Sequence, residues 1–120
     1  MRTALAIWNG RVSPVFDVSR QILILDIENG TVIARNRQVL DDNDPLRRAG
    51  RLADMKVETL LCGAISRCLS NLLAAYGIRI IPFIAGEAED VISAYLAGNL
   101  PNPAMAMPGC LRRCRRLQGR

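Results

Sequence analysis

The sequence of 120 residues contains no histidine, and aromatic residues make up only 4% of it. The absence of histidine excludes a Ser-His-Asp or Cys-His catalytic centre and any histidine-ligated metal site. Because large aromatic side chains are so scarce, the hydrophobic core has to be built mainly from Leu, Ile, Val and Ala. Lysine is almost absent as well, since Lys56 is the only one.

Long apolar runs and targeting features are also missing. No run approaches the ~18 residues of a membrane span, and the N-terminus lacks the charged, apolar and small-residue regions of a signal peptide. A cytoplasmic protein is therefore expected. In that compartment cysteines are thiols or metal ligands rather than disulfides. The four cysteines are Cys62, Cys68, Cys110 and Cys114.

The formal net charge of +5 is concentrated at the C-terminus. Residues 1–109 hold eleven basic and eleven acidic side chains, so the body of the chain is neutral. We therefore expect a single folded domain over residues 1–100 and a flexible tail over residues 101–120 that is rich in Pro, Arg and Cys. The excess charge comes from Arg112, Arg113, Arg115, Arg116 and Arg120.

Hydrophobic patterning predicts a hairpin followed by alternating helices and strands. Apolar and β-branched runs predict strands over residues 3–7, 21–28, 31–40, 57–62 and 78–84. The dipeptide Asn29-Gly30 is a strong signal for a tight turn between the second and third strands. Helical spacing and capping residues predict helices over residues 45–56, 66–76 and 86–96. In the first of these, Leu46, Ala49, Leu52 and Ala53 are expected to face the core.

This order of elements is typical of an α/β fold. Strands that are reached through helices are expected to run parallel to a neighbour. We therefore expect a mixed five-stranded sheet in the order 3-2-1-4-5, with strand 2 antiparallel and helices on both faces. Its carboxyl edge, where open α/β sheets bind ligands, would bring together residues 9–20, 62–67 and 85–87.

The segment Asn9–Arg20 directly follows the first strand and is predicted to be an irregular ligand-binding loop. In this interpretation Asn9 and Gly10 supply backbone N–H groups, with Ser13 beside them. Arg11 supplies positive charge and Phe16 an apolar lid. Asp17 could orient Arg11 or Arg20. In the alternative interpretation the segment is an ordinary surface loop in which Phe16 plugs one end of the core.

The segment Cys62–Arg67 is the second predicted part of the site. Because a helix N-terminus stabilises anions, the amides there, with the Arg67 side chain, would form an anion pocket. Gly86 is also expected to be a binding residue. Cys62 and Cys68 are candidate metal ligands, and the pair Cys110 and Cys114 is a weaker candidate. Alternatively, Cys62 is a small buried residue, Cys68 packs beside Leu72, and the tail is solvated. The predicted pocket residues are Gly63, Ala64, Ile65, Ser66 and Arg67.

With these motifs in order, the chain resembles the dinitrogenase iron-molybdenum cofactor biosynthesis family. The resemblance covers about residues 3–100 and implies a three-layer ribonuclease H-like fold that binds or carries metal–sulfur cofactors or clusters. Many relatives carry a histidine where Val15 stands here, so that metal ligand is missing. The resemblance rests on Gly10–Asp17, on Cys62–Ile65 at a helix start, on Gly77–Ile81 and on Ala94–Leu100.

The function predicted from these features is a non-enzymatic carrier or scaffold for a metal–sulfur cofactor or cluster that contains molybdenum, iron or both. Its other partners would be donor and acceptor proteins, without a membrane. The first strand lacks the carboxylates that a metal-dependent nuclease needs, and no nucleophile has a base partner.

Two alternatives remain. One is an interaction module that docks on a protein or nucleic acid through its Arg-rich tail, although the lack of interleaved aromatic residues disfavours nucleic acid. The other is a thiol redox protein that uses Cys62 and Cys68.

Overall fold

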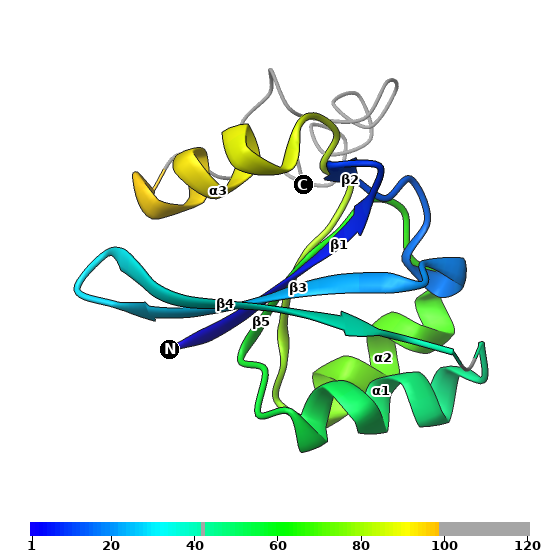
Figure 1. Cartoon of the computed structure of the whole chain (residues 1–120). Helices are drawn as coiled ribbons and strands as arrows, with labels where there is room; N and C mark the ends of the chain where they lie inside the picture. The colour runs from blue at the N-terminus through cyan, green and yellow to red at the C-terminus, as the bar shows by residue number, and fades with distance from the viewer. Residues whose placement is uncertain (42, 99–120) are drawn as a thin grey trace, which may run out of the picture.

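The central sheet contains the five predicted strands in the predicted order, in a computed structural model that describes residues 1–41 and 43–98. The order is β4-β3-β1-β5-β6, with β1, β5 and β6 parallel and β3 antiparallel to both neighbours. This confirms the α/β fold (Figure 1). The strands are β1 (Arg2–Trp8), β3 (Gln21–Glu28), β4 (Thr31–Val39), β5 (Thr59–Leu61) and β6 (Arg79–Ile81).

The sheet has six strands rather than five, because Arg11–Val12 forms a short strand, β2, antiparallel to the end of β1. The prediction of an irregular loop from Asn9 onwards was wrong at this point. Asn9 and Gly10 have φ angles of 52° and 74°, as a type I′ hairpin turn requires. The same turn, at Asn29 and Gly30, joins β3 to β4 as predicted.

Three helices cover the two faces of the sheet, as expected. Helices α1 (Pro45–Asp54) and α2 (Arg67–Ala75) lie on one face, and α3 (Ala88–Leu96) lies on the other (Figure 1). The alternation of side chains along β1 divides the core accordingly. Ala4 and Ala6 belong to the cluster under α1 and α2, whereas Leu5 and Ile7 belong to the cluster under α3.

Helix α1 departs from the predicted pattern of burial. Leu46, which was expected to face the core, is 59% exposed, while Arg48 is 1% exposed. Arg48 donates to the carbonyl of Ser19 at 2.6 Å, and its guanidinium carbon lies 5.5 Å from the centre of the Phe16 ring. A hydrophobic pattern cannot predict this, because the buried residue is charged. Arg48 thereby joins α1 to the segment that follows β2.

The tail predicted over residues 101–120, with Cys110 and Cys114, lies outside the described residues, so the boundary at residue 100 stays a prediction. Within the residues that are described, no helix is both long and apolar enough to cross a membrane.

Candidate ligand-binding site

The three segments predicted to meet at the carboxyl edge of the sheet are hydrogen-bonded to one another. Phe16 N donates to the Ala64 carbonyl at 2.8 Å, and Ala64 N donates to the Pro14 carbonyl at 2.8 Å. Val12 N donates to the Gly86 carbonyl at 3.0 Å. The loop after β1 is therefore attached to both of its predicted neighbours.

These contacts use several of the groups that the sequence suggested were available for an anion. Ala64 N is occupied by Pro14, and Ser66 N donates to Asp17 Oδ1 at 2.8 Å. Asp17 therefore holds the start of α2 and is not aimed at Arg11 or Arg20. Arg11 is paired with Glu87. The expected cradle of amides and arginine is thus partly occupied by contacts within the protein, at Ala64, Ser66 and Arg11.

The edge is packed too closely at Gly63 for any larger residue. A Cβ atom built on Gly63 would lie 2.5 Å from the carbonyl oxygens of both Ser13 and Pro14. Real Cβ atoms do not approach backbone oxygens so closely. Glycine at this position therefore sets the distance between the β5–α2 turn and the loop.

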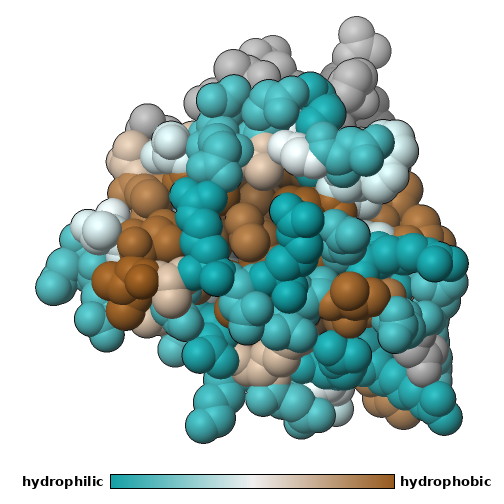
Figure 2. All heavy atoms as spheres, in the orientation of Figure 1, coloured by the Kyte–Doolittle hydropathy of each residue, from teal (hydrophilic) through white to brown (hydrophobic). Residues whose placement is uncertain are grey.

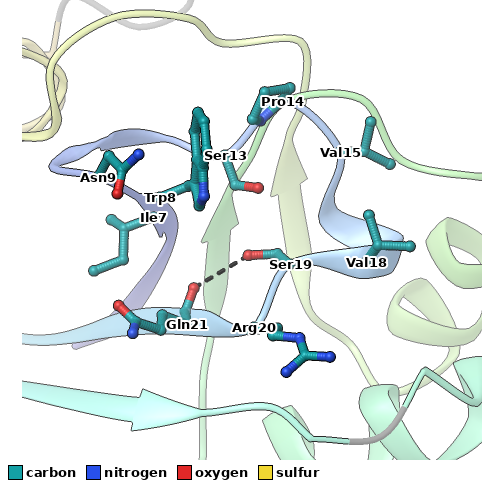
Figure 3. Close-up of a pocket in the computed structure, with 10 residues that line it drawn as sticks. All are labelled: Ile7, Trp8, Asn9, Ser13, Pro14, Val15, Val18, Ser19, Arg20 and Gln21. Carbon is teal, nitrogen blue, oxygen red and sulfur yellow. Dashed lines mark hydrogen bonds between the residues drawn. The ribbon is translucent and has the colours of Figure 1, made fainter.

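A cleft of about 600 Å³ opens beside the loop after β1, at the end of β1 and the start of β3 (Figure 3). Most of its wall comes from the loop that was predicted to bind a ligand. We refer to it below as the cleft. It is lined by Ile7, Trp8, Asn9, Ser13, Pro14, Val15, Val18, Ser19, Arg20 and Gln21.

The lining of the cleft combines apolar walls with polar groups that can donate hydrogen bonds. Trp8, Val15 and Val18 are 59%, 40% and 61% exposed, so three large apolar side chains are grouped around one cleft. Ser13 is only 6% exposed, yet its hydroxyl has no hydrogen-bond partner among the described residues. Arg20 carries the only charge in the lining, which contains no carboxylate. This combination suits an anionic ligand that accepts hydrogen bonds.

The predicted binding residues divide into three groups. Asn9 and Ser13 line the cleft. Phe16 is fully buried in the core under α1 and α2, which corrects its predicted role as a lid and agrees with the alternative placement of its ring at one end of the core. The remaining predicted residues lie along the edge but do not line the cleft: Gly10, Arg11, Gly63, Ala64, Ile65, Ser66, Arg67 and Gly86.

Three residues that line the cleft lie outside the predicted loop: Ile7, Trp8 and Gln21. A tryptophan at the very end of a strand, followed directly by a turn dipeptide, is a signal for an exposed aromatic side chain at the sheet edge. Gln21 is the first residue of β3. It lines the cleft because it pairs with Ile7 at the end of β1. Strand pairing, which a single sequence does not give, brings it there.

The chain matches one protein family over the part that the structure describes. The model of one family, described as dinitrogenase iron-molybdenum cofactor, matches residues 1–98. The chain belongs to the dinitrogenase iron-molybdenum cofactor family. The resemblance noted in the sequence is therefore confirmed over almost the whole described domain. No curated protein matches the chain.

Solved structures share the fold of this family member. The crystal structure of PH0822 is 25% identical, with a TM-score of 0.76 over 82% of this chain and 92% of that one. A protein from Methanocaldococcus jannaschii is 19% identical, with a TM-score of 0.71 over 86% and 97% of the two chains. The apo form of the orange protein from Desulfovibrio gigas is 21% identical, with a TM-score of 0.71 over 88% and 94%.

The two cysteines within the described residues differ in exposure. Cys62 is fully buried at the end of β5, and burial, with a smaller contribution from Asp17, raises the pKa of its thiol from 9.0 to about 12. Cys68 is exposed in the first turn of α2. Because the thiolate is the metal-binding and reactive form, Cys62 is poorly suited to ligation or redox chemistry. Among the described residues, no three Cys, Asp or Glu side chains form a group that could hold a metal ion.

The raised pKa of Cys62 predicts a loss of stability in alkaline solution. The folded state keeps the thiol proton up to about pH 12, whereas a thiol of ordinary pKa 9.0 in the unfolded chain releases it earlier. The contribution is fully present below pH 9.0 and is lost as the pH rises toward 12. In that window the free energy of unfolding should fall by about 1.4 kcal/mol per pH unit from this group.

Urea denaturation at a series of alkaline pH values measures this slope. The Cys62→Ala variant should show a shallower decline than the wild type, whatever its stability at neutral pH. The Cys68→Ala variant is the matched control and should keep the wild-type slope. Identical slopes for all three proteins would show that Cys62 ionises as easily in the folded state as in the unfolded chain.

Proposed function

We propose that this family member is a non-enzymatic carrier of a metal–sulfur cofactor or cluster, containing molybdenum, iron or both, which is held in the cleft. The observation that supports this best is the lining of the cleft, where hydrogen-bond donors and one arginine occur without any carboxylate. The family description, dinitrogenase iron-molybdenum cofactor, supports the class of cargo. The protein would work in the cytoplasm between a donor and an acceptor protein.

The groups in the cleft match the chemistry of such a cargo. Sulfides of an anionic metal–sulfur species accept hydrogen bonds, and their negative charge has to be offset. The Ser13 hydroxyl, the Asn9 side-chain amide and the Trp8 indole N–H are available donors, because none has a hydrogen-bond partner among the described residues. The apolar side chains beside them would exclude water and strengthen these contacts.

Binding without a cysteine ligand is consistent with a carrier, which has to release its cargo. Because no cysteine among the described residues lines the cleft and Cys62 is buried with a raised pKa, we expect the cargo to be held by hydrogen bonds and charge. The related orange protein has been described in an apo form, as a removable ligand would allow. The same raised pKa disfavours the alternative of a thiol redox protein.

Anaerobic reconstitution tests the proposal. The purified protein is incubated with iron, molybdate and sulfide, separated from excess reagents, and examined by absorption spectroscopy and metal analysis. We expect charge-transfer bands and a constant ratio of metal to protein. The Cys68→Ala variant should bind the same amount. Colourless protein without metal after this treatment would contradict the proposal.

Charge reversal at the rim of the cleft should weaken the binding of an anionic cargo. Replacing Arg20 by Glu removes an attraction and adds a repulsion, which we expect to raise the Kd about tenfold, or ~1.4 kcal/mol. Arg79→Glu is the matched control. Arg79 lies on β6, an edge strand away from the cleft, so this variant should bind as the wild type does. Equal affinity of both variants at low salt would show that the cargo does not lie near Arg20.

A further inference from the structure

Strand β4 forms a long, open edge of the sheet. It has nine residues and pairs with β3 on one side, and no described strand lies on its other side (Figure 1). Seven of its residues are exposed, and the other two are only half-buried. The opposite edge strand, β6, has three residues. A free edge of this length presents a row of backbone N–H and C=O groups to which another strand can pair.

The side chains of β4 differ between its two faces. On the α3 face lie Arg35, Arg37 and Val39, opposite Leu25, Leu23 and Gln21 of β3. The other face carries only small or uncharged side chains, Ala34, Asn36 and Gln38. The side of the molecule that Figure 2 shows carries both polar and apolar patches. The charge of the edge is therefore concentrated at two alternate positions on one face.

These two arginines have charge available for a partner. Arg37 forms no ion pair within the described residues. Arg35 is paired with Glu89 of α3 at 2.7 Å, but both side chains are well exposed, at 44% and 68%. Exposed pairs of this kind contribute little stability, so Arg35 can turn to another carboxylate at small cost.

We propose that β4 is a docking edge for an extended acidic segment of a partner protein. The segment would add a strand beside β4, with carboxylates at two alternate positions facing Arg35 and Arg37 and an aliphatic residue facing Val39. Main-chain hydrogen bonds would supply affinity, and the paired charges would fix the register, as in other cases of strand addition.

The same charges make a second copy of this chain a poor occupant of the edge. Antiparallel pairing of two β4 strands centred on Arg35 sets Arg35 directly opposite its equivalent. A shift by two residues sets Arg35 opposite Arg37, and in-register parallel pairing aligns both arginines with their equivalents. Like charges directly opposite one another destabilise a sheet. An acidic strand meets attraction at both positions.

The β4 edge lies close to the cleft, which suits the transfer of a cargo. This link to cargo transfer rests on the proposed carrier function. Val39, at the end of β4, pairs with Gln21, which lines the cleft. A segment docked along β4 would thus end one strand away from the cleft. The docking itself needs no cargo and can be tested on the protein alone.

Fluorescence anisotropy with labelled peptides tests the proposal. The probe is a peptide of the length of β4 that has glutamate at two successive same-face positions, valine at the next, and threonine elsewhere. We expect saturable binding that Arg37→Glu weakens at least about tenfold, whereas Arg79→Glu on β6 changes it less than about twofold. A peptide with lysine in place of glutamate should not bind.

N-methylation of the peptide separates strand pairing from simple charge attraction. In a strand, the backbone N–H groups of alternate residues point to opposite edges, and only one edge of the peptide would bond to β4. Two probes are therefore needed: one is methylated at the odd-numbered residues and the other at the even-numbered residues. Only one of them should lose binding. The proposal is overturned if the glutamate peptide does not bind, if both methylated probes bind equally, or if the chain dimerises through β4. Failure of reconstitution with intact peptide binding would contradict the carrier function but not this docking edge.

Discussion

Replacing Phe16 by alanine should lower the free energy of unfolding by about 3–5 kcal/mol. The ring is fully buried among the residues under α1 and α2 and receives the guanidinium of Arg48 at 5.5 Å. Removing it creates a cavity and takes away the ring that faces a buried charge. Because Phe16 begins the short 3-10 turn Phe16–Val18 beside the cleft, the loop should also lose its fixed position.

Urea denaturation followed by circular dichroism measures this loss. The Phe16→Leu variant is the matched control, since it refills most of the volume and should lose less than about 1.5 kcal/mol. A loss below about 1 kcal/mol for Phe16→Ala would show that the ring is not a core residue. The original interpretation of Phe16 as a lid over the ligand would then have to be reconsidered.

Replacing Gly63 by alanine should lower the free energy of unfolding by about 1–3 kcal/mol, an unusually large effect for one added methyl group. The new Cβ would meet the carbonyl oxygens of Ser13 and Pro14 at 2.5 Å, so backbone has to move. The movement would also stretch the hydrogen bond from Ala64 N to the Pro14 carbonyl. Since Ser13 and Pro14 line the cleft, binding of the cargo should weaken together with stability.

Gly50→Ala provides a control with the opposite expected sign. Gly50 lies within α1, and a Cβ there would find only the Tyr76 hydroxyl, at an ordinary distance of 3.8 Å. Alanine at this helical site should stabilise the protein by about 0.5–1 kcal/mol. Calorimetric melting of both variants gives the comparison. Equal effects would mean that Gly63 is not in close contact with the loop.

Much of the fold could be predicted from the sequence because its local signals agree with one another. Asp44 and Ser66 cap α1 and α2 as predicted, with side-chain oxygens 3.2 Å from the amides of Leu46 and Leu69. A hairpin followed by two helical crossover connections is compatible with only a few strand orders. The hairpin turn at Asn9 carries the same sequence signal as the turn at Asn29, because both are Asn-Gly dipeptides that directly follow a strand.

The candidate site was harder to predict than the fold. The sequence identified the loop, but not which of its groups the fold would use internally. The pairing of Arg11 with Glu87 and the bond from Ser66 N to Asp17 join residues far apart in the chain. Neither contact follows from local pattern. The burial of Arg48 is of the same kind, because its acceptor, Ser19, belongs to a distant segment.

The most direct test of the central claim is to map an anionic metal sulfide onto the protein by NMR. Thiomolybdate is diamagnetic and soluble, and ¹H–¹⁵N spectra recorded during its anaerobic addition report on each amide. Trp8 is the only tryptophan, so its indole N–H gives a single resolved signal from the cleft. We predict saturable shifts of that signal and of the amides of Asn9, Ser13 and Val18–Gln21. Shifts confined to Cys68 and the start of α2, or no saturable shift at all, would contradict a cargo site in the cleft.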